Sequence, residues 1–202
     1  MRKESICDNE KKRLRAELKA RRDRLADKPR LSALACDRLI PLLFGSVMVY
    51  VSIGSELDTS ALIDRLFMNA EITLYAPYTV DGVIYPLRLV KSGKPDGMGN
   101  LPIECYDGDD FSAVFGSNGN RMPKIDCCIT PFLGINGDGY RIGYGKGCYD
   151  RFFGTASVAR KIGLAFDCQL CDFTPEIRDV PLDCCVFDTK VVYFEHNASD
   201  CG

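Results

Sequence analysis

Histidine is almost absent from this chain of 202 residues. The one histidine, His196, lies six residues from the end. A Ser-His-Asp triad, a Cys-His pair and a multi-histidine zinc site all need a histidine held rigidly beside its partners. A chain terminus is a poor place for such a residue. These three kinds of site are therefore not expected here.

Long apolar runs and a strong excess of charge are also missing. No stretch approaches the roughly 18 uninterrupted apolar residues that a membrane span needs, and the start lacks the apolar segment of a signal peptide. The net charge is −2, with 46% apolar and 27% charged residues. We therefore expect a cytoplasmic globular protein with no membrane partner and no bulk binding of nucleic acid. Residues 1–202 fit a single domain.

Cysteine is frequent, with eleven residues, but the cysteines are spread through apolar segments and no secretory signal precedes them. We expect them to be reduced, and the adjacent pairs 127–128 and 184–185 to be buried as small apolar side chains. Cys168 and Cys171 form a C-x-x-C, which is found in redox sites and in half of a zinc site. No second C-x-x-C or nearby histidine completes a metal site, so a structural role is favoured.

Lys and Arg are concentrated between Lys11 and Arg30, where Leu14, Leu18 and Leu25 recur at helical spacing. This pattern predicts a basic amphipathic helix with a narrow apolar stripe. Its charges form either a solvated face or a contact with an anionic substrate.

Apolar runs and helical segments alternate along the rest of the chain, which predicts an α/β fold with a mostly parallel sheet and helices on both faces. A loop is expected at 91–102, which is rich in Gly, Pro and Asn. Helices are expected at 31–44 with an end near Pro41, at 59–68 with Thr59 as N-cap, and at 149–153; strands at 47–51, 72–75 ended by Pro77, 125–130, 161–166, 184–187 and 191–194; and an edge strand at 83–90 containing Pro86.

The most informative stretch runs from Gly134 to Arg151, where glycines lie directly before a helical segment. Glycines 143, 145 and 147 allow backbone N–H groups to approach an anion closely, and the following helix offers its N-terminal dipole. Lys146 adds a point charge and Arg141 a fork of donors. Asp150, one turn into the helix, is placed to hold a magnesium ion between phosphate oxygens. The segment predicts a phosphate-binding loop; the alternative is a long hairpin whose glycines serve only turns.

Two common glycine motifs do not fit this loop. A Walker loop needs Ser or Thr after its lysine and a glycine six residues before it, but Gly147 follows Lys146 and Tyr140 stands at the earlier position. A dinucleotide fingerprint needs G-x-G-x-x-G, whereas these glycines are spaced two and two, so a nicotinamide cofactor is not expected.

The segment RIGYGKGCYDRF, from Arg141 to Phe152 after a strand that ends in Pro131, resembles the 5-formyltetrahydrofolate cyclo-ligase family, also called methenyltetrahydrofolate synthetases. The family pattern is G-x-R-L-G-[YR]-G-K-G-Y-Y-D-R. Nearly the whole chain is similar to the family through four further segments: K-x-x-L-R at 11–15, GSELD at 54–58, IGLAFD at 162–167 with Gln169, and DVPLD at 179–183. The resemblance implies the three-layer fold shared with sugar-phosphate isomerases and CoA transferases, although that shared fold alone does not imply their functions.

The resemblance also implies site residues. Lys146 and Arg141 are the expected catalytic residues, and Asp150 and Asp183 the expected magnesium ligands. The other basic residues of the N-terminal helix are expected to stay solvated. ATP is expected to bind Lys11, Arg15, Arg141, Ile142, Gly143, Tyr144, Gly145, Lys146, Gly147, Cys148 and Tyr149, and the folate to bind Glu56, Tyr144, Gly145 and Tyr149.

The implied reaction converts 5-formyltetrahydrofolate, with or without a polyglutamate tail, to 5,10-methenyltetrahydrofolate, with ATP as co-substrate and Mg²⁺, in a monomer. Phosphoryl transfer depends on positioning and charge neutralisation, which suits a site without histidine. Two departures from the family concern pterin packing or affinity: Cys148 stands where Tyr is usual, and Arg178 where His is usual. Glu104 keeps an acid of the middle loop and is a weak candidate for folate contact. The alternative function is a non-catalytic nucleotide- or RNA-binding member of the same fold.

Overall fold

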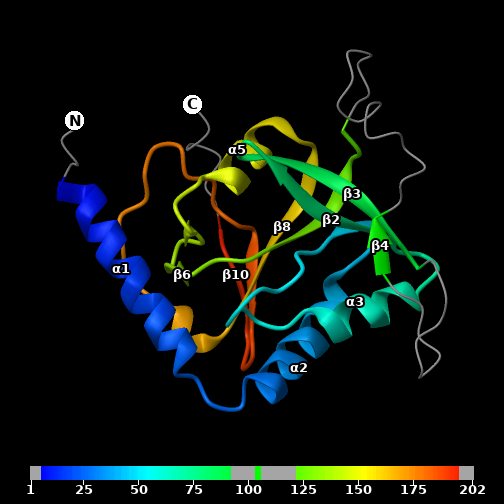
Figure 1. The fold of residues 1–202 in the computed structure, drawn as a ribbon, viewed down its shortest axis with the longest axis horizontal. Coiled ribbons are helices and arrows are strands. Elements are labelled where there is room, and N and C mark those ends of the chain that lie inside the picture. Colours follow the sequence, from blue (N-terminus) through cyan, green and yellow to red (C-terminus); the bar gives the residue numbers. More distant parts are fainter. Residues whose placement is uncertain (1–5, 92–102, 106–121, 196–202) are drawn as a thin grey trace.

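The computed structural model describes residues 6–91, 103–105 and 122–195, and an eight-stranded sheet forms its centre (Figure 1). The expected loop at 91–102 falls almost entirely outside these residues, as do His196 and the side chain of Glu104. The strand order is β10-β9-β8-β5-β1-β2-β3-β4, with β1 Ser46–Met48, β2 Thr73–Val80, β3 Val83–Lys91, β4 Ile103–Cys105, β5 Ile125–Thr130, β8 Val158–Ala165, β9 Cys184–Phe187 and β10 Val191–Tyr193.

The five central strands, from β9 to β2, are parallel, and antiparallel strands flank them on both sides. This confirms the predicted mostly parallel sheet. The apolar run of β9 is buried at all four positions, as expected for a strand covered on both faces. Cys127, Cys128, Cys184 and Cys185 are buried in β5 and β9, which confirms the prediction for the two cysteine pairs.

Helices cover both faces of the sheet, as the side-chain alternation of the strands shows. Val47 of β1 packs with helices α2 (Lys28–Leu39) and α3 (Ser60–Phe67), whereas the next residue, Met48, packs with Phe152 of helix α5 (Cys148–Thr155). Successive residues of a strand point to opposite faces. In Figure 1, α2 and α3 accordingly lie below the sheet and α5 above it.

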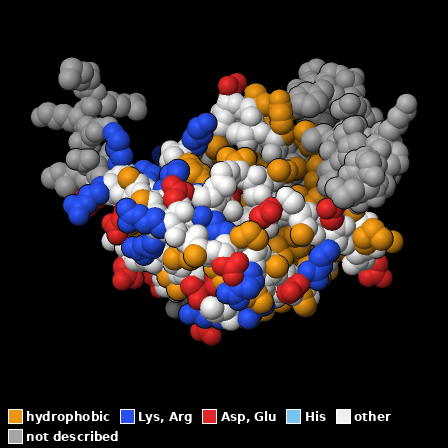
Figure 2. Space-filling model, turned by 60° about the horizontal axis from the view of Figure 1, so that its bottom comes forward, with side chains coloured by type: hydrophobic (Ala, Val, Ile, Leu, Met, Phe, Trp, Pro, Cys, Tyr) orange, Lys and Arg blue, Asp and Glu red, His pale blue; other side chains and the backbone are white. Residues whose placement is uncertain are grey.

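Helix α1 (Ile6–Asp23) lies at one side of the molecule and buries Leu18 (Figure 1). The prediction of one helix from Lys11 to Arg30 was wrong at its end. Asp27 has a positive φ of 55° and caps α2, whose first turn contains Pro29, so a new helix starts there. On the face shown in Figure 2, Lys and Arg side chains are interspersed with Asp and Glu.

Two strand predictions around the prolines were also wrong. β2 does not end at Pro77, because Pro77 lies directly opposite Pro86 of β3 and pairing continues on either side. Proline has no backbone N–H, so the two residues that cannot donate a hydrogen bond lie opposite each other at a single position of the strand pair. β3 is not the edge strand, since β4 pairs with it on its other side. The second predicted helix ends at Leu39, close to Pro41 as expected, and a single 3-10 turn, Ile40–Leu42, contains this proline.

The chain changes direction at β1. It first builds β2 and β3 on one side of β1 and then returns to place β5 on the other side. In an open parallel sheet, the crevice beyond the carboxyl ends of two such strands is the usual ligand site. Among the described helices, none is both long and apolar enough to cross a membrane.

Candidate active site

A cavity of about 550 Å³ lies beyond the carboxyl ends of β1 and β5, where Tyr50 and Pro131 follow these strands. Its wall comes from α1, the loop after β1, strands β2 and β3, the glycine loop, the start of α5 and the segment before β9. The cavity collects every site residue predicted above except Asp183: Lys11, Arg15, Glu56, Arg141, Ile142, Gly143, Tyr144, Gly145, Lys146, Gly147, Cys148, Tyr149 and Asp150.

The glycine loop connects a short hairpin to helix α5. The hairpin pairs β6 (Gly134–Ile135) with β7 (Arg141–Ile142), and α5 begins at Cys148. Gly145 and Gly147 have positive φ values of 94° and 59°, which favour glycine. A side chain at Gly145 would also meet the guanidinium of Arg15, whose Nε donates to the carbonyl of Gly143 at 3.1 Å. The glycines therefore serve the loop conformation, and Arg15 connects the loop to α1.

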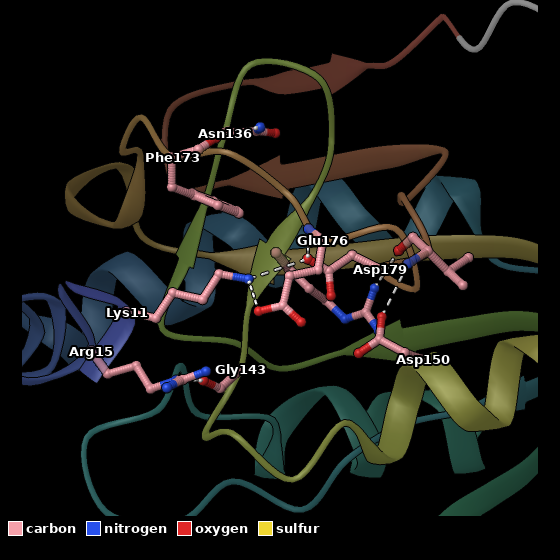
Figure 3. A network of polar contacts seen from close by, with 10 residues as sticks. Lys11, Arg15, Asn136, Gly143, Asp150, Phe173, Glu176 and Asp179 are labelled. Atoms are coloured by element: carbon pink, nitrogen blue, oxygen red, sulfur yellow. Dashed lines mark hydrogen bonds and ion pairs between the residues drawn. The ribbon is translucent and has the colours of Figure 1, made fainter. Parts of the chain in front are cut away.

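The cationic side chains around this loop differ in their partners. Lys146 is exposed, and its ammonium has no ion-pair partner among the described residues. Lys11 contacts two carboxylates, at 2.6 Å from its Nζ to Glu176 Oε1 and 3.6 Å to Asp179 Oδ2 (Figure 3). Lys146 thus presents an unneutralised charge to a ligand, whereas Lys11 is already paired.

Arg141 is buried and fully engaged at its two terminal nitrogens. Nη2 donates to Asp150 Oδ1 at 2.7 Å, and Nη1 donates to the carbonyl of Val180 at 2.6 Å. Burial lowers the pKa of Arg141, and the neighbouring Asp150 opposes that effect. The guanidinium also lies 5.1 Å from the ring centre of Phe153. Arg141 therefore fixes Asp150 and the segment around Val180 in place.

Carboxylates at the same end of the cavity come from two segments. Asp150 Oδ1 accepts from Arg141 and from the backbone N–H of Val180, while Oδ2 has no hydrogen-bond partner among the described residues. Asp179, the neighbour of Val180 in sequence, lines the same cavity with Glu176. The sequence analysis missed Glu176 and Asp179 as site residues, although the DVPLD segment contains Asp179 and was a signal for it.

The structure does not bring Asp183 to this group. Its Oδ2 accepts from the backbone N–H of Lys161 at 2.6 Å, and its Oδ1 lies 3.2 Å from Lys161 Nζ, outside the cavity lining. Asp183 therefore does not line the cavity with Asp150, whereas Asp179 and Glu176 do.

The carboxylates of the cavity fit a magnesium ion that is held partly by the phosphates of a bound substrate. No group of three or more His, Cys, Asp or Glu side chains in the described part of the chain is arranged to hold a metal alone. Magnesium usually keeps several waters and binds one or two carboxylates together with substrate phosphates. The open Oδ2 of Asp150, beside Asp179, meets this requirement.

Glu56 also lines the cavity, where it is buried and its carboxylate is held from two sides. Oε1 accepts from the hydroxyl of Tyr144 at 2.7 Å, and Oε2 accepts from the backbone N–H of Ile53 at 3.0 Å. Burial raises the pKa of Tyr144. The Tyr144 hydroxyl in turn accepts from Arg22, which is buried rather than solvated, so the expectation for this basic residue was wrong.

Aromatic and apolar side chains form another part of the cavity wall. Tyr50 and Tyr149 line it, and burial raises the pKa of both phenols, so both remain neutral. Val51 and Ile53 line the rim and are exposed to solvent. Cys148 also lines the cavity, with its sulfur 3.8 Å from Arg151 Nη2. Such a wall suits a planar, largely apolar ring system.

Cys168 and Cys171 lie away from this cavity lining and are free thiols. Burial raises the pKa of each thiol, which disfavours the reactive thiolate. The geometry supports the structural role predicted for this pair.

Comparisons with known proteins agree on one family. The model of the 5-formyltetrahydrofolate cyclo-ligase family matches residues 7–188. The 5-formyltetrahydrofolate cyclo-ligase of Escherichia coli K12 is 30% identical over 156 residues, covering 72% of this chain and 79% of that protein. The protein of the same name from Mycoplasma genitalium is 43% identical over 90 residues, covering 42% of this chain; the chain spans 54%, about half, of that relative's length.

A solved structure shows the same fold. The NMR structure of 5,10-methenyltetrahydrofolate synthetase from Aquifex aeolicus matches with a TM-score of 0.66 at 24% identity, covering 93% of this chain and 94% of that one. The expected three-layer architecture is therefore found in a solved protein.

Proposed function

The chain belongs to the 5-formyltetrahydrofolate cyclo-ligase family, and from this we propose that it converts 5-formyltetrahydrofolate to 5,10-methenyltetrahydrofolate with ATP, releasing ADP and phosphate. One observation carries the proposal: a single cavity is lined both by a glycine loop with an unpaired lysine and by a buried carboxylate. A nucleotide phosphate and an aromatic ring with N–H donors can thus meet inside it.

The phosphate end is assigned to the loop 143–147 and its cations. Backbone N–H groups of the loop and the N-terminus of α5 are the proposed donors to the phosphates, and Lys146 and Arg15 add positive charge. In the proposed reaction the formyl oxygen attacks the γ-phosphorus and ADP leaves. Nitrogen 10 then attacks the phosphorylated imidate carbon, and phosphate leaves as the ring closes. Lys146 offsets the charge that develops on the transferred group.

Asp150 and Asp179 are the proposed magnesium ligands, in place of the pair first expected. The ion would neutralise phosphate charge and hold the phosphates in place. Arg141 keeps Asp150 oriented through its 2.7 Å contact, so its proposed role is to position this carboxylate.

The folate end is assigned to Glu56, Tyr144 and Tyr149. Glu56 accepts hydrogen bonds and so suits the N–H groups of a pterin, while the apolar wall between the ends suits its ring. We further propose a monomer and a substrate with or without a polyglutamate tail. The eight cysteines whose side chains the structure describes are free, which supports a reducing compartment such as the cytoplasm.

The experiment is to incubate the purified protein with 5-formyltetrahydrofolate, magnesium and ATP, and to follow the absorbance of the methenyl product. A rise that needs both ATP and protein supports the proposal. If folded protein binds ATP in the presence of magnesium but forms no product, the activity is refuted and the non-catalytic nucleotide-binding alternative takes its place.

A further inference from the structure

Arg22 is a buried cation in the last turns of α1, and its side chain faces the cavity wall rather than solvent. It is 2% exposed. Its neighbours on α1 behave differently: Arg21 pairs with Glu17 and Lys19 pairs with Asp23 at the surface. A buried charge is costly unless it is hydrogen-bonded, so the contacts of Arg22 need an account.

Those contacts join three segments that line the cavity. Nε of Arg22 donates to Ser55 Oγ at 3.2 Å, next to Glu56 in sequence. Nη1 donates to the carbonyl of Phe132 at 3.2 Å, directly after Pro131. Nη2 donates to the Tyr144 hydroxyl at 2.8 Å in the glycine loop. One guanidinium thus ties α1 to the loop after β1, the end of β5 and the glycine loop.

The hydrogen bond from Arg22 to the Tyr144 hydroxyl also determines where this hydroxyl donates its proton. The Tyr144 hydroxyl has one proton, and because the oxygen accepts from Arg22, the proton is given to Glu56 Oε1 at 2.7 Å. The guanidinium carbon lies 5.9 Å from the ring centre of Tyr144, a cation–π distance that further fixes the ring. Glu56 is therefore held as an acceptor-only group at a fixed place.

We propose that Arg22 is a positioning residue for the folate end of the cavity, acting through the Tyr144 hydroxyl on the Glu56 carboxylate. The inference rests on the proposed function, because it assigns Glu56 and Tyr144 to the folate. Arg22 touches neither ligand. It orders the acceptor that takes an N–H donor of the pterin, and it does so from the helix whose other end brings Lys11 and Arg15 to the phosphate end.

The test compares Arg22→Met with Arg24→Met, a control on the neighbouring exposed position outside the cavity. For Arg22→Met, KM for 5-formyltetrahydrofolate should rise about tenfold or more, the scale of losing a hydrogen bond to a charged group, while KM for ATP stays near the wild-type value. Arg24→Met should leave both constants unchanged. A purely structural role would displace α1 and raise both KM values together, which would overturn the proposal.

Tyr144→Phe provides the second arm and keeps the test decisive if Arg22→Met fails to fold. It removes the hydroxyl that carries the effect, so it should also raise KM for the folate selectively. In the Tyr144→Phe background, Arg22→Met, or Arg22→Lys if needed, should add little further change. An unchanged KM for the folate in Tyr144→Phe would contradict the inference. So would a double variant whose increase in this KM equals the product of the increases in the two single variants.

Failure of the proposed function would give a different result. Isothermal titration of the wild-type protein with 5-formyltetrahydrofolate alone would then show no binding. Binding to the wild type with equal affinity in Arg22→Met would instead refute only the role of Arg22.

Discussion

The charged side chains of the cavity are held to different degrees, and this decides what each can do. Arg141 is bound by Asp150 and Val180, and Lys11 is bound by Glu176 and Asp179. Lys146 has no such partner among the residues that the structure describes and stands on a loop that approaches Arg15. A phosphate can therefore engage Lys146 without displacing a carboxylate, whereas Lys11 must first leave its acidic partners.

Replacement of Lys146 by alanine should lower kcat by roughly 10²-fold or more, because one charge-stabilising donor to the transferred phosphoryl group is lost. The protein should remain as stable as the wild type, since the side chain is exposed. Steady-state kinetics with saturating ATP and folate measures the effect. Lys190→Ala, at an exposed position in the turn between β9 and β10, is the matched control. Unchanged kcat in Lys146→Ala would remove this residue from the mechanism.

The two acids of the DVPLD segment should separate in their magnesium dependence. Asp179→Asn should raise the magnesium concentration needed for half-maximal activity, because Asp179 shares the cavity with Asp150. Asp183→Asn should leave that concentration unchanged and cost at most about 1 kcal/mol of stability, the scale of a partly exposed ion pair such as its pair with Lys161. Titrating the activity of both variants with magnesium measures this concentration. If Asp183→Asn raises it and Asp179→Asn does not, Asp183 is the ligand instead.

The contiguous residues of the site could be predicted from their own pattern, and Lys11, Arg15 and Glu56 through the family resemblance, but other distant residues were missed. The ten positions from 141 to 150 follow one another, so their chemistry can be judged together. Glu176 lines the same cavity from a loop far away in sequence, and Arg22 contacts the cavity residue Tyr144 from helix α1. Burial of Arg22 could not be foreseen, because it depends on acceptors at Phe132 and Tyr144 that only the folded chain brings to it.

At the scale of elements, the start of α3 illustrates how local competition shifts a predicted cap. Thr59 is at the N-cap position, as expected, but its hydroxyl donates to the carbonyl of Tyr50 at 2.7 Å. Asp58 Oδ1 instead accepts from the backbone N–H and the hydroxyl of Ser60. The position was predictable from residue type; the identity of the capping group depended on where β1 ends.

The Asp58 contact should make stability depend on pH. Hydrogen bonds from the backbone and side chain of Ser60 lower the pKa of Asp58 in the folded protein. Its contribution is therefore present above the unfolded pKa of about 3.9 and is lost as pH falls through the lower folded value. Asp58→Asn keeps an acceptor without the titration, so its free energy of unfolding should fall less steeply below about pH 4 than that of the wild type. Urea unfolding across this range measures the difference, and parallel curves would exclude the effect.

At the scale of the whole molecule, the sheet and its layers were predictable because the central strands are apolar runs separated by helical segments. The flanking strands were harder to predict. β4 has only three residues, and Pro77 does not end β2 as a proline usually would, because it pairs with Pro86. Short strands carry too little pattern to be recognised, and their pairing depends on tertiary contacts.

Gly163 in β8 is tightly packed against neighbouring side chains. A Cβ there would lie 2.8 Å from Phe132 Cε1 and 2.9 Å from both Cys185 Sγ and Leu182 Cδ1. Gly163→Ala should therefore destabilise the protein by about 1–3 kcal/mol through overpacking. Gly154→Ala, in α5 with open space around the new methyl, should instead stabilise it by about 0.5–1 kcal/mol. Equal effects in denaturant unfolding would contradict this view of the packing.

The central claim is that one cavity couples ATP cleavage to closure of the folate ring. The most direct test measures phosphate release and methenyl product in the same reaction of the purified wild-type protein. We expect phosphate and product to appear in equal amounts, and neither to form when 5-formyltetrahydrofolate is left out. Phosphate release at the same rate without the folate, or release without the methenyl product, would contradict it.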